Sequence, residues 1–316
     1  MQNAQAIGID IGGTKIVGAV VDADGTIGRR IQVQTEAHKG GDAVLQKLVD
    51  IVTGLRTPAI VGVGIGTPGP VDTKHGVVKQ VVNIAGWQDT PVARLMQERI
   101  NLPTWLGNDG NVAALAEYWK GAGRGKKVVV VLTLGTGVGS GVVIDGAIMD
   151  GATGWAAELG HVSIAFDGRK CACGKTGCIE AYASANATFK RYVEKLGSRT
   201  DTLVMQKAGG DAGRIDAKMV CDAAREGEPL ASEVVGETGF YLGVFCGSLI
   251  NALNPDVILL GGGMSAAGDI LFDRVREVAG RESLRDPFAA TAILPAALGN
   301  DAGLVGAAAL VHLAQR

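Results

Sequence analysis

The chain has 316 residues, of which 47% are hydrophobic and 20% charged, and its formal net charge is −2. That length is sufficient for two domains with substantial cores. Lysines and arginines dispersed at this net charge exclude the basic surface that nucleic-acid binding needs. No apolar run reaches transmembrane length, no signal sequence is visible at the start, and the cysteines suit a reducing compartment. We therefore expect a cytoplasmic protein that binds neither nucleic acid nor membrane.

The first 120 residues read as a strand hairpin followed by alternating strands and helices. Period-two and helical spacing of apolar residues predict strands over 7–11, 16–21, 26–35, 61–65 and 104–107, and helices over 42–55, 91–100 and 111–120. Asn108 and Asp109 therefore lie at a strand-to-helix junction. One of Asn108, Asp109 and Asn111 should cap that helix, which leaves the others available for function.

A second copy of the pattern begins at Val128. It predicts strands over 128–134, 141–144, 257–260 and 291–294, a Gly-rich turn over 135–140, and helices over 185–196, 216–226, 230–253, from 269 and over 302–314. Each half of the chain begins with a strand, a Gly/Thr turn and a second strand. This repetition predicts two α/β domains, 1–120 and 121–301, with a cleft between them. The C-terminal helix, within 302–316, should pack back on the first domain.

Glycine-rich turns follow three of the predicted strands. Glycines allow backbone N–H groups to approach phosphate oxygens, and Thr and Lys side chains add donors. An Asp just before the first turn can hold Mg²⁺ directly or through water. One such hairpin alone is more often only a turn, but the three together favour nucleotide binding. The predicted nucleotide-binding residues are Asp10, Gly12, Gly13, Thr14, Lys15, Thr136, Gly137, Gly261 and Gly262.

One histidine and three cysteines lie within eighteen residues of each other, at His161, Cys171, Cys173 and Cys178. Thiolates and an imidazole are the ligand set of tetrahedral zinc. The alternative interpretation is a surface loop with incidental cysteines, which this spacing disfavours. A redox sensor is also disfavoured, because zinc would occupy the thiolates. The metal is expected to be structural and to hold a binding loop rigid.

Carboxylates lie beside this cluster and at the strand-to-helix junction. Asp109 can take a proton from a substrate hydroxyl as that hydroxyl attacks a γ-phosphate. Glu158 and Glu180 flank the cluster, and carboxylates are suited to reading neighbouring hydroxyls of a sugar. His161 can bind zinc through one ring nitrogen and a substrate oxygen through the other.

Eight segments carry a resemblance that spans essentially the whole chain. They are DIGGTK (10–15), GTPGP (66–70), NIAGW (83–87), NDGN (108–111), LGTGVGSG (134–141), GATGWAAELGH (151–161), CACGKTGCIE (171–180) and GGG (261–263). With these segments the chain resembles the ROK family (repressors, open reading frames and kinases) of the actin-like ATPase superfamily, and most closely its bacterial glucokinases. The cysteine cluster and the Glu-x-Gly-His unit are the most specific of these motifs.

The resemblance implies a two-lobed actin-like ATPase (ribonuclease H-like) fold, with mixed sheets flanked by helices and a cleft between the lobes. It implies phosphorylation of a hexose, glucose above all, at the 6-hydroxyl by ATP with Mg²⁺, in a homodimer or homotetramer with structural zinc. Asp109 matches the catalytic base. The positions that match sugar-binding residues, or lie near the same pocket, are Gly69, Asn83, Asn108, Asp109, Glu158, His161 and Glu180. The matching zinc ligands are His161, Cys171, Cys173 and Cys178.

Three alternatives stay open at this point. The sugar can be N-acetylglucosamine, N-acetylmannosamine, mannose or fructose, and the donor can be polyphosphate. A sugar-sensing regulator without catalysis is less favoured, because the first strand begins by Ile7 and we expect no helix-turn-helix domain before it. Ala157 and Gly110 depart from the family, which often has Gly and Ala at these two positions.

Overall fold

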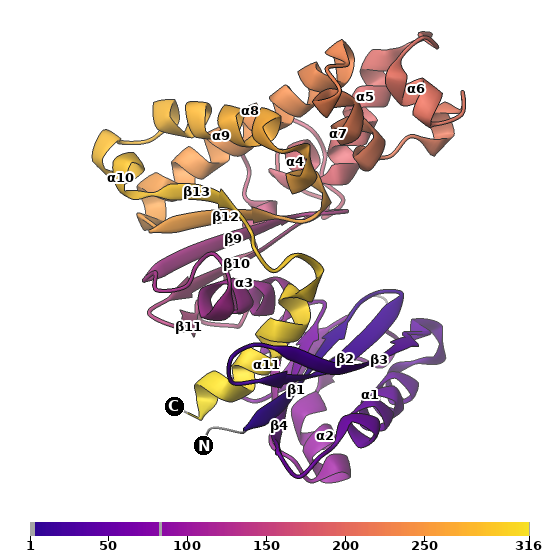
Figure 1. Ribbon diagram of the computed structural model, residues 1–316, viewed down its shortest axis with the longest axis vertical. Helices are drawn as coiled ribbons and strands as arrows, with labels where there is room; N and C mark the ends of the chain where they lie inside the picture. Colours follow the sequence, from indigo (N-terminus) through magenta and orange to yellow (C-terminus); the bar gives the residue numbers. More distant parts are fainter. Residues whose placement is uncertain (1–3, 82–83, 316) are drawn as a thin grey trace. The chain divides into compact units, whose positions relative to one another are not determined.

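The computed structural model describes residues 4–81 and 84–315, which form two compact units (Figure 1). The first unit comprises Met1–Gly125, Gly141–Ala157 and Leu298–Arg316, and the second comprises Lys126–Ser140 and Glu158–Ala297. The last segment of the chain thus belongs to the same unit as the first.

A five-stranded mixed sheet forms the centre of the first unit, in the order β3-β2-β1-β4-β8. Its strands are β1 (Gln5–Ile11), β2 (Lys15–Asp22), β3 (Ile27–Gln34), β4 (Ile60–Thr67) and β8 (Thr104–Asn108). Strand β1 pairs antiparallel with β2 and parallel with β4, which pairs parallel with β8. Side chains alternate along β1, so Ile7, Ile9 and Ile11 point to one face of the sheet and Gly8 and Asp10 to the other.

Helices cover both faces of this sheet (Figure 1). Helix α1 (Gly41–Leu55) packs its apolar stripe into the core on the isoleucine face. Helix α11 (Ala302–Ala314) covers the other face, together with α3 (Asp109–Lys120). A Cβ atom on Gly8 would lie 2.2 Å from the Leu304 carbonyl oxygen, and one on Gly64 would lie 1.7 Å from the Ala307 carbonyl oxygen. Helix α11 therefore rests directly on the backbone of β1 and β4, which only glycine permits.

The second unit contains three parallel strands, with β12 between β9 and β13. These are β9 (Val128–Leu134), β12 (Val257–Gly261) and β13 (Ala292–Pro295). Its longest helices, α8 (Pro229–Leu253) and α9 (Asp269–Glu282), pack against each other. Gly239, Gly243 and Gly247 form one stripe of α8, where an added Cβ would lie within 3.0 Å of a side chain of α9. The stripe explains how closely the two helices approach.

The remaining elements are shorter. Strands β5 (Val71–Asp72), β6 (Val77–Gln80) and β7 (Gln88–Thr90) form a small antiparallel sheet, and β10 (Val138–Ile144) pairs with β11 (Ala147–Ile148). The other helices are α2 (Val92–Ile100), α4 (Glu180–Ala183), α5 (Ala185–Leu196), α6 (Leu203–Lys207), α7 (Ala217–Arg225) and α10 (Arg285–Ala290). Single 3₁₀ turns lie at Ala37–Lys39, Leu159–His161, Ala212–Arg214, Gly263–Ala267 and Gly299–Asp301.

Mixed sheets flanked by helices confirm the predicted fold class, with local corrections. Helix α3 begins at Asp109 rather than Asn111, because Asn108 caps it. Val138, Gly139 and Ser140 belong to strand β10 and not to the preceding turn. Pro91 precedes the first turn of α2 as its N-cap residue. Within 4–81 and 84–315, no helix is both long and apolar enough to span a bilayer.

Substitution of Gly64 by alanine should lower the free energy of unfolding by about 3 kcal/mol, because a backbone oxygen of α11 cannot move away from the new methyl group. Urea denaturation measures this. Gly28→Ala is the matched control, since a Cβ there would lie 3.6 Å from the nearest atom and should change stability by less than about 0.5 kcal/mol. Equal effects of the two substitutions would contradict the close packing of α11.

Candidate active site and metal cluster

The predicted site residues divide between the two units. The first unit carries Asp10, Gly12, Gly13, Thr14, Lys15, Gly69, Asn108 and Asp109. The second carries Thr136, Gly137, Glu158, His161, Cys171, Cys173, Cys178, Glu180, Gly261 and Gly262. Asn83 lies outside the described residues.

Asn108 is the residue that caps helix α3. Its side-chain oxygen accepts hydrogen bonds from the N–H groups of Gly110 at 2.9 Å and Asn111 at 3.3 Å. Its amide group donates to the Gly69 carbonyl at 3.0 Å. Gly69 has a φ of 79°, and a Cβ there would lie 2.2 Å from the Gln80 carbonyl oxygen. Two of the predicted sugar-binding residues are therefore in direct contact, at a turn that requires glycine.

Asp109 is the first residue of α3 and is left available by the cap. Its Oδ1 accepts a hydrogen bond from the Gly110 N–H at 2.8 Å. The residue is exposed, so a substrate hydroxyl can reach the carboxylate. The surrounding protein nevertheless removes enough water to raise the pKa of Asp109 above its ordinary value, against the lowering effect of hydrogen bonds from Gly110 and Asn108. A raised pKa makes a carboxylate a better proton acceptor.

Asp10 lies on the α11 face of β1, in the same unit as Asp109. A Cβ on Gly303 of α11 would lie 2.7 Å from the Asp10 carboxyl group, so glycine is needed there as well. Burial, and then the negative charge of Asp109, raise the pKa of Asp10 to about 6, while Lys15 opposes this. A divalent cation would reduce the electrostatic repulsion between the carboxylates of Asp10 and Asp109. This fits the prediction that Asp10 holds Mg²⁺ directly or through water.

The hairpin between β1 and β2 presents its backbone to solvent. Gly12 donates its N–H to the Lys15 carbonyl at 2.9 Å, and the Thr35 hydroxyl donates to the Gly12 carbonyl at 2.7 Å. Gly13, Thr14 and Lys15 are exposed, and a Cβ on Gly13 would meet no atom within 4 Å. Thr35 and Gly303 carry no sequence signal of their role, because neither lies near a site motif in the chain.

In the second unit, Glu180 joins the glycine loop to the cysteine cluster. Its Oε2 accepts a hydrogen bond from the Val138 N–H at 3.0 Å, and the Cys171 thiol donates to its Oε1 at 3.4 Å. A Cβ on Gly137 would lie 2.3 Å from the same Oε2. The loop must therefore carry glycine here for the carboxylate to lie as it does. On the other side of this loop, Gly262 has a φ of 81° and packs against the backbone of Leu134.

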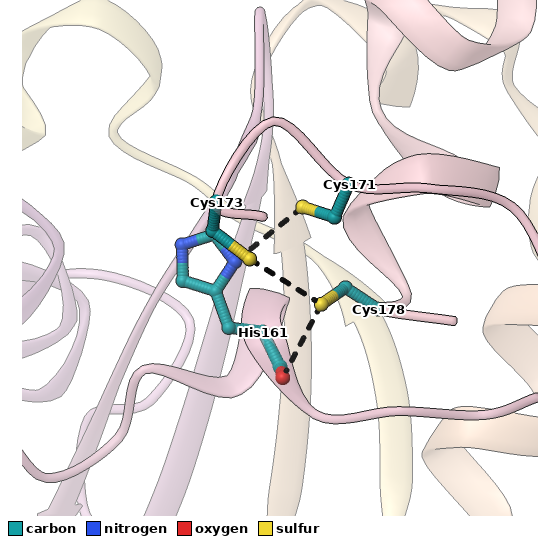
Figure 2. A group of neighbouring side chains, drawn as sticks. All are labelled: His161, Cys171, Cys173 and Cys178. Atoms are coloured by element: carbon teal, nitrogen blue, oxygen red, sulfur yellow. Dashed lines mark hydrogen bonds between the residues drawn. The ribbon is translucent and has the colours of Figure 1, made fainter. Parts of the chain in front are cut away.

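The side chains of His161, Cys171, Cys173 and Cys178 converge (Figure 2), with ligand atoms all within 4.8 Å of one another. The Sγ atoms of Cys173 and Cys178 are 3.7 Å apart, and Cys171 Sγ lies 3.8 Å from His161 Nδ1. A tetrahedral zinc with Zn–S bonds of about 2.3 Å places its sulfur ligands about 3.8 Å apart. Disulfide sulfurs would be about 2.05 Å apart, and all five cysteines are free. The donor set and its spacing thus fit zinc.

Turns with glycine at positive φ build the loop around the cluster. Gly174 and Gly177 have φ values of 88° and 83°, and a Cβ on Gly177 would lie 1.7 Å from the Ala165 carbonyl oxygen. Nδ1 of His161 faces the sulfurs, whereas its other ring nitrogen points away from them (Figure 2). That second nitrogen can bind a substrate oxygen.

Glu158 immediately precedes the 3₁₀ turn that ends at His161. The N–H of Leu159 donates to the Ser140 hydroxyl at 2.9 Å, which anchors this turn to the start of β10. Ala157, just before it, is buried and has a φ of 62°. Such a φ favours glycine, the residue that the family often has there.

The glycine hairpin with an acidic residue before it, the carboxylate at a capped helix start and the Cys₃His cluster are the features that the resemblance assigns to sugar kinases of the actin-like ATPase type. Residues 6–314 match the ROK family. The chain belongs to that family.

Glucokinases of other organisms are similar over nearly their full length. The chain is 35% identical to the glucokinase of Halalkalibacterium halodurans, over 98% of this chain and 96% of that protein. It is 34% identical to the glucokinase of Thermotoga maritima, over 98% of both chains. The crystal structure of a ROK family glucokinase from Streptomyces griseus in complex with glucose and AMPPNP superposes with a TM-score of 0.83, at 34% identity, covering 97% of this chain and 99% of that one.

Replacing Asp10 with asparagine should stabilise the protein at pH 7.5 and not below pH 4. The pKa of Asp10 is about 6 in the folded chain against an ordinary value of 3.8. Between these values the folded state binds more protons than the unfolded state, so stability falls as pH rises through this window. Above pH 6 the full penalty applies, and Asp10→Asn should recover about 2 kcal/mol of it.

Thermal unfolding in EDTA at the two pH values measures this difference. Asp24→Asn is the control, because the Asp24 carboxylate is 94% exposed in the same unit. Its substitution should change stability by less than about 0.5 kcal/mol at either pH. A stabilisation by Asp10→Asn that is the same at both pH values would show that the charge of Asp10 is not its cause.

Proposed function

We propose that this protein phosphorylates glucose at its 6-hydroxyl with ATP and Mg²⁺. Family membership and full-length similarity to glucokinases support this proposal. The observation that carries it in the structure is the junction of β8 and α3, where Asn108 serves as cap and holds Gly69, and so leaves Asp109 to face a substrate.

In the proposed reaction, Asp109 accepts the proton of the 6-hydroxyl as that oxygen attacks the γ-phosphate, and ADP leaves. Asn108, Glu158, His161 and Glu180 bind the sugar hydroxyls. Mg²⁺, when bound, neutralises phosphate charge. Asp10 and the hairpin of Gly12, Gly13, Thr14 and Lys15 bind the metal and phosphates from the first unit, and Thr136, Gly137 and Gly262 bind the nucleotide from the second.

Initial rates of ADP release with Mg-ATP over glucose, mannose, fructose, N-acetylglucosamine and N-acetylmannosamine test the proposal. Glucose should give the highest kcat/KM. Asp109→Asn should lower kcat by at least about 1,000-fold, while glucose binding by calorimetry stays within about threefold, because a general base acts in the transition state and contributes little to ground-state binding.

Turnover of Asp109→Asn near the wild-type rate would remove Asp109 as the base. A higher rate with another sugar would leave Asp109 and the loops in place and change the substrate. Turnover only with polyphosphate would change the donor. No turnover with any pair of substrates would favour a sugar-sensing regulator.

We also propose that His161, Cys171, Cys173 and Cys178 hold one structural zinc ion. Metal analysis of the purified protein should give about one zinc per chain, and a strong chelator should lower Tm by roughly 5 °C or more, because zinc that binds only the folded chain stabilises it.

Cys178→Ser should lose the zinc, whereas Cys221→Ala, at a buried thiol outside the cluster, should keep it. Full zinc content in Cys178→Ser, or a wild-type protein without zinc, would contradict this site. Homodimer or homotetramer assembly remains part of the proposal, and size-exclusion chromatography with light scattering tests it.

A further inference from the structure

Two segments of the first unit that lead to predicted sugar-binding positions lie against each other. One is the small antiparallel sheet of β5, β6 and β7, which begins just after the turn at Gly69. The other is the loop over 149–157, which follows β11 and runs directly into Glu158. Contacts between the two segments therefore fix the course of the chain as it approaches Glu158.

A glycine turn of this loop packs closely against strand β5. Gly154 has a φ of 79°, and a Cβ there would lie 2.3 Å from the Val71 carbonyl oxygen. Val71 is itself buried in the core of the unit, so the strand cannot move away. The loop thus lies on the small sheet at a position where only glycine fits.

A side-chain hydrogen bond joins the same two segments. The hydroxyl of Thr73, one residue beyond β5, donates to Asp150 Oδ2 at 2.6 Å. This distance is typical of a hydroxyl that donates to a carboxylate. The Asp150 carbonyl accepts a hydrogen bond from the Ala156 N–H at 3.1 Å, so the same residue also closes its own loop. Both Thr73 and Asp150 are half-buried.

The carboxylate of Asp150 depends on Thr73 because its second oxygen is shielded from water. Asp150 Oδ1 is buried and, within 4–81 and 84–315, has no hydrogen-bond partner. Without the Thr73 hydroxyl, the carboxylate would have to turn toward water to be solvated. That movement would draw the loop away from the small sheet.

We propose that Thr73 and Asp150 are positioning residues for sugar binding. Their hydrogen bond holds the loop over 149–157 on the small sheet, and so sets the course of the chain into Glu158 against the segment that carries Gly69. The inference rests on the proposed function in one respect, that Gly69 and Glu158 belong to the sugar site. The two residues act through the loop and not by contact with the sugar.

Hydrogen–deuterium exchange of the peptide over 149–157 tests the contact without any ligand. Thr73→Val removes the hydroxyl but keeps the shape of the side chain, and it should speed exchange of the protected Ala156 amide roughly tenfold. Thr73→Ser retains a hydroxyl and should restore the wild-type rate. Thr53→Val is the matched control, since the Thr53 hydroxyl donates to Val49 within helix α1 of the same unit. It should leave the loop unchanged.

A double-mutant cycle tests whether the two residues act as a pair. Asp150→Ala should also speed exchange of the Ala156 amide. Thr73→Val combined with Asp150→Ala should exchange no faster than Asp150→Ala alone, because both substitutions remove the same hydrogen bond. Additive effects would show that the two residues act separately and would overturn the inference.

Kinetics and calorimetry of the same variants measure the consequence for the sugar that gives the highest kcat/KM. Thr73→Val should raise the KM and the Kd for that sugar roughly tenfold. The KM for ATP should stay within about twofold, because the hairpin over 10–15 takes no part in the contact. A general structural defect would raise both KM values. Thr73→Ser should return the sugar KM to that of the wild type.

Unchanged exchange in Thr73→Val would overturn the inference, and so would faster exchange with an unchanged sugar Kd in a protein that phosphorylates the sugar. Faster exchange in a protein that turns over no sugar would keep this hydrogen bond as the contact that holds the loop and would reject the kinase. The two proposals can therefore fail separately.

Discussion

Helix α11 rests directly on the backbone of β1 and β4. The positions of the two carboxylates of the candidate site in this unit, Asp10 and Asp109, depend on that contact. Gly8 and Gly64 allow the helix to approach the sheet this closely, since a Cβ on either would overlap a carbonyl oxygen of the helix. Gly303 and Gly306, on α11 itself, face Asp10 and the Val112 carbonyl in the same close manner. The helix thereby fixes the strand that carries Asp10 against the helix that begins with Asp109.

The sequence predicted the longer elements well and the contacts between them poorly. Apolar periodicity placed α1 and α5 within about a residue of their ends, because each buries a stripe. Helix α11 was placed as closely, although it is buried on most sides and carries a nearly continuous apolar run instead of a stripe. Strands β5, β6, β7 and β11 were missed, since two to four residues carry no measurable period. The role of Gly64 was also invisible. A glycine within a strand normally indicates only a weaker strand, and the partner that requires it lies more than two hundred residues away in the chain.

For the site residues too, the sequence indicated which residue types can act, whereas their contacts became known only from the structure. Cysteine and histidine spacing was enough to name four ligand candidates, and the structure brings those side chains together. Spacing alone left three candidates for the cap of α3, which only the hydrogen bonds of Asn108 decide. The departure at Ala157 has a physical meaning only through its φ of 62°, a conformation that costs a non-glycine residue about 1 kcal/mol.

Glu180 is where the proposed functions of the second unit meet. Its carboxylate contacts the cluster through Cys171 and contacts the glycine loop through Val138. Glu180 follows Cys178 by two residues, and the Ala181 N–H donates to the Cys178 carbonyl at 2.9 Å. A rigid metal cluster would therefore fix the backbone that carries this carboxylate, and the carboxylate in turn holds the loop that is proposed to bind the nucleotide. Zinc in that position would orient Glu180 without taking part in the reaction. The lack of a side chain at Gly137 would be as necessary for this orientation as any zinc ligand. The conformation of the glycine loop then depends on metal binding at the cluster, and the side chain of Glu180 connects the two.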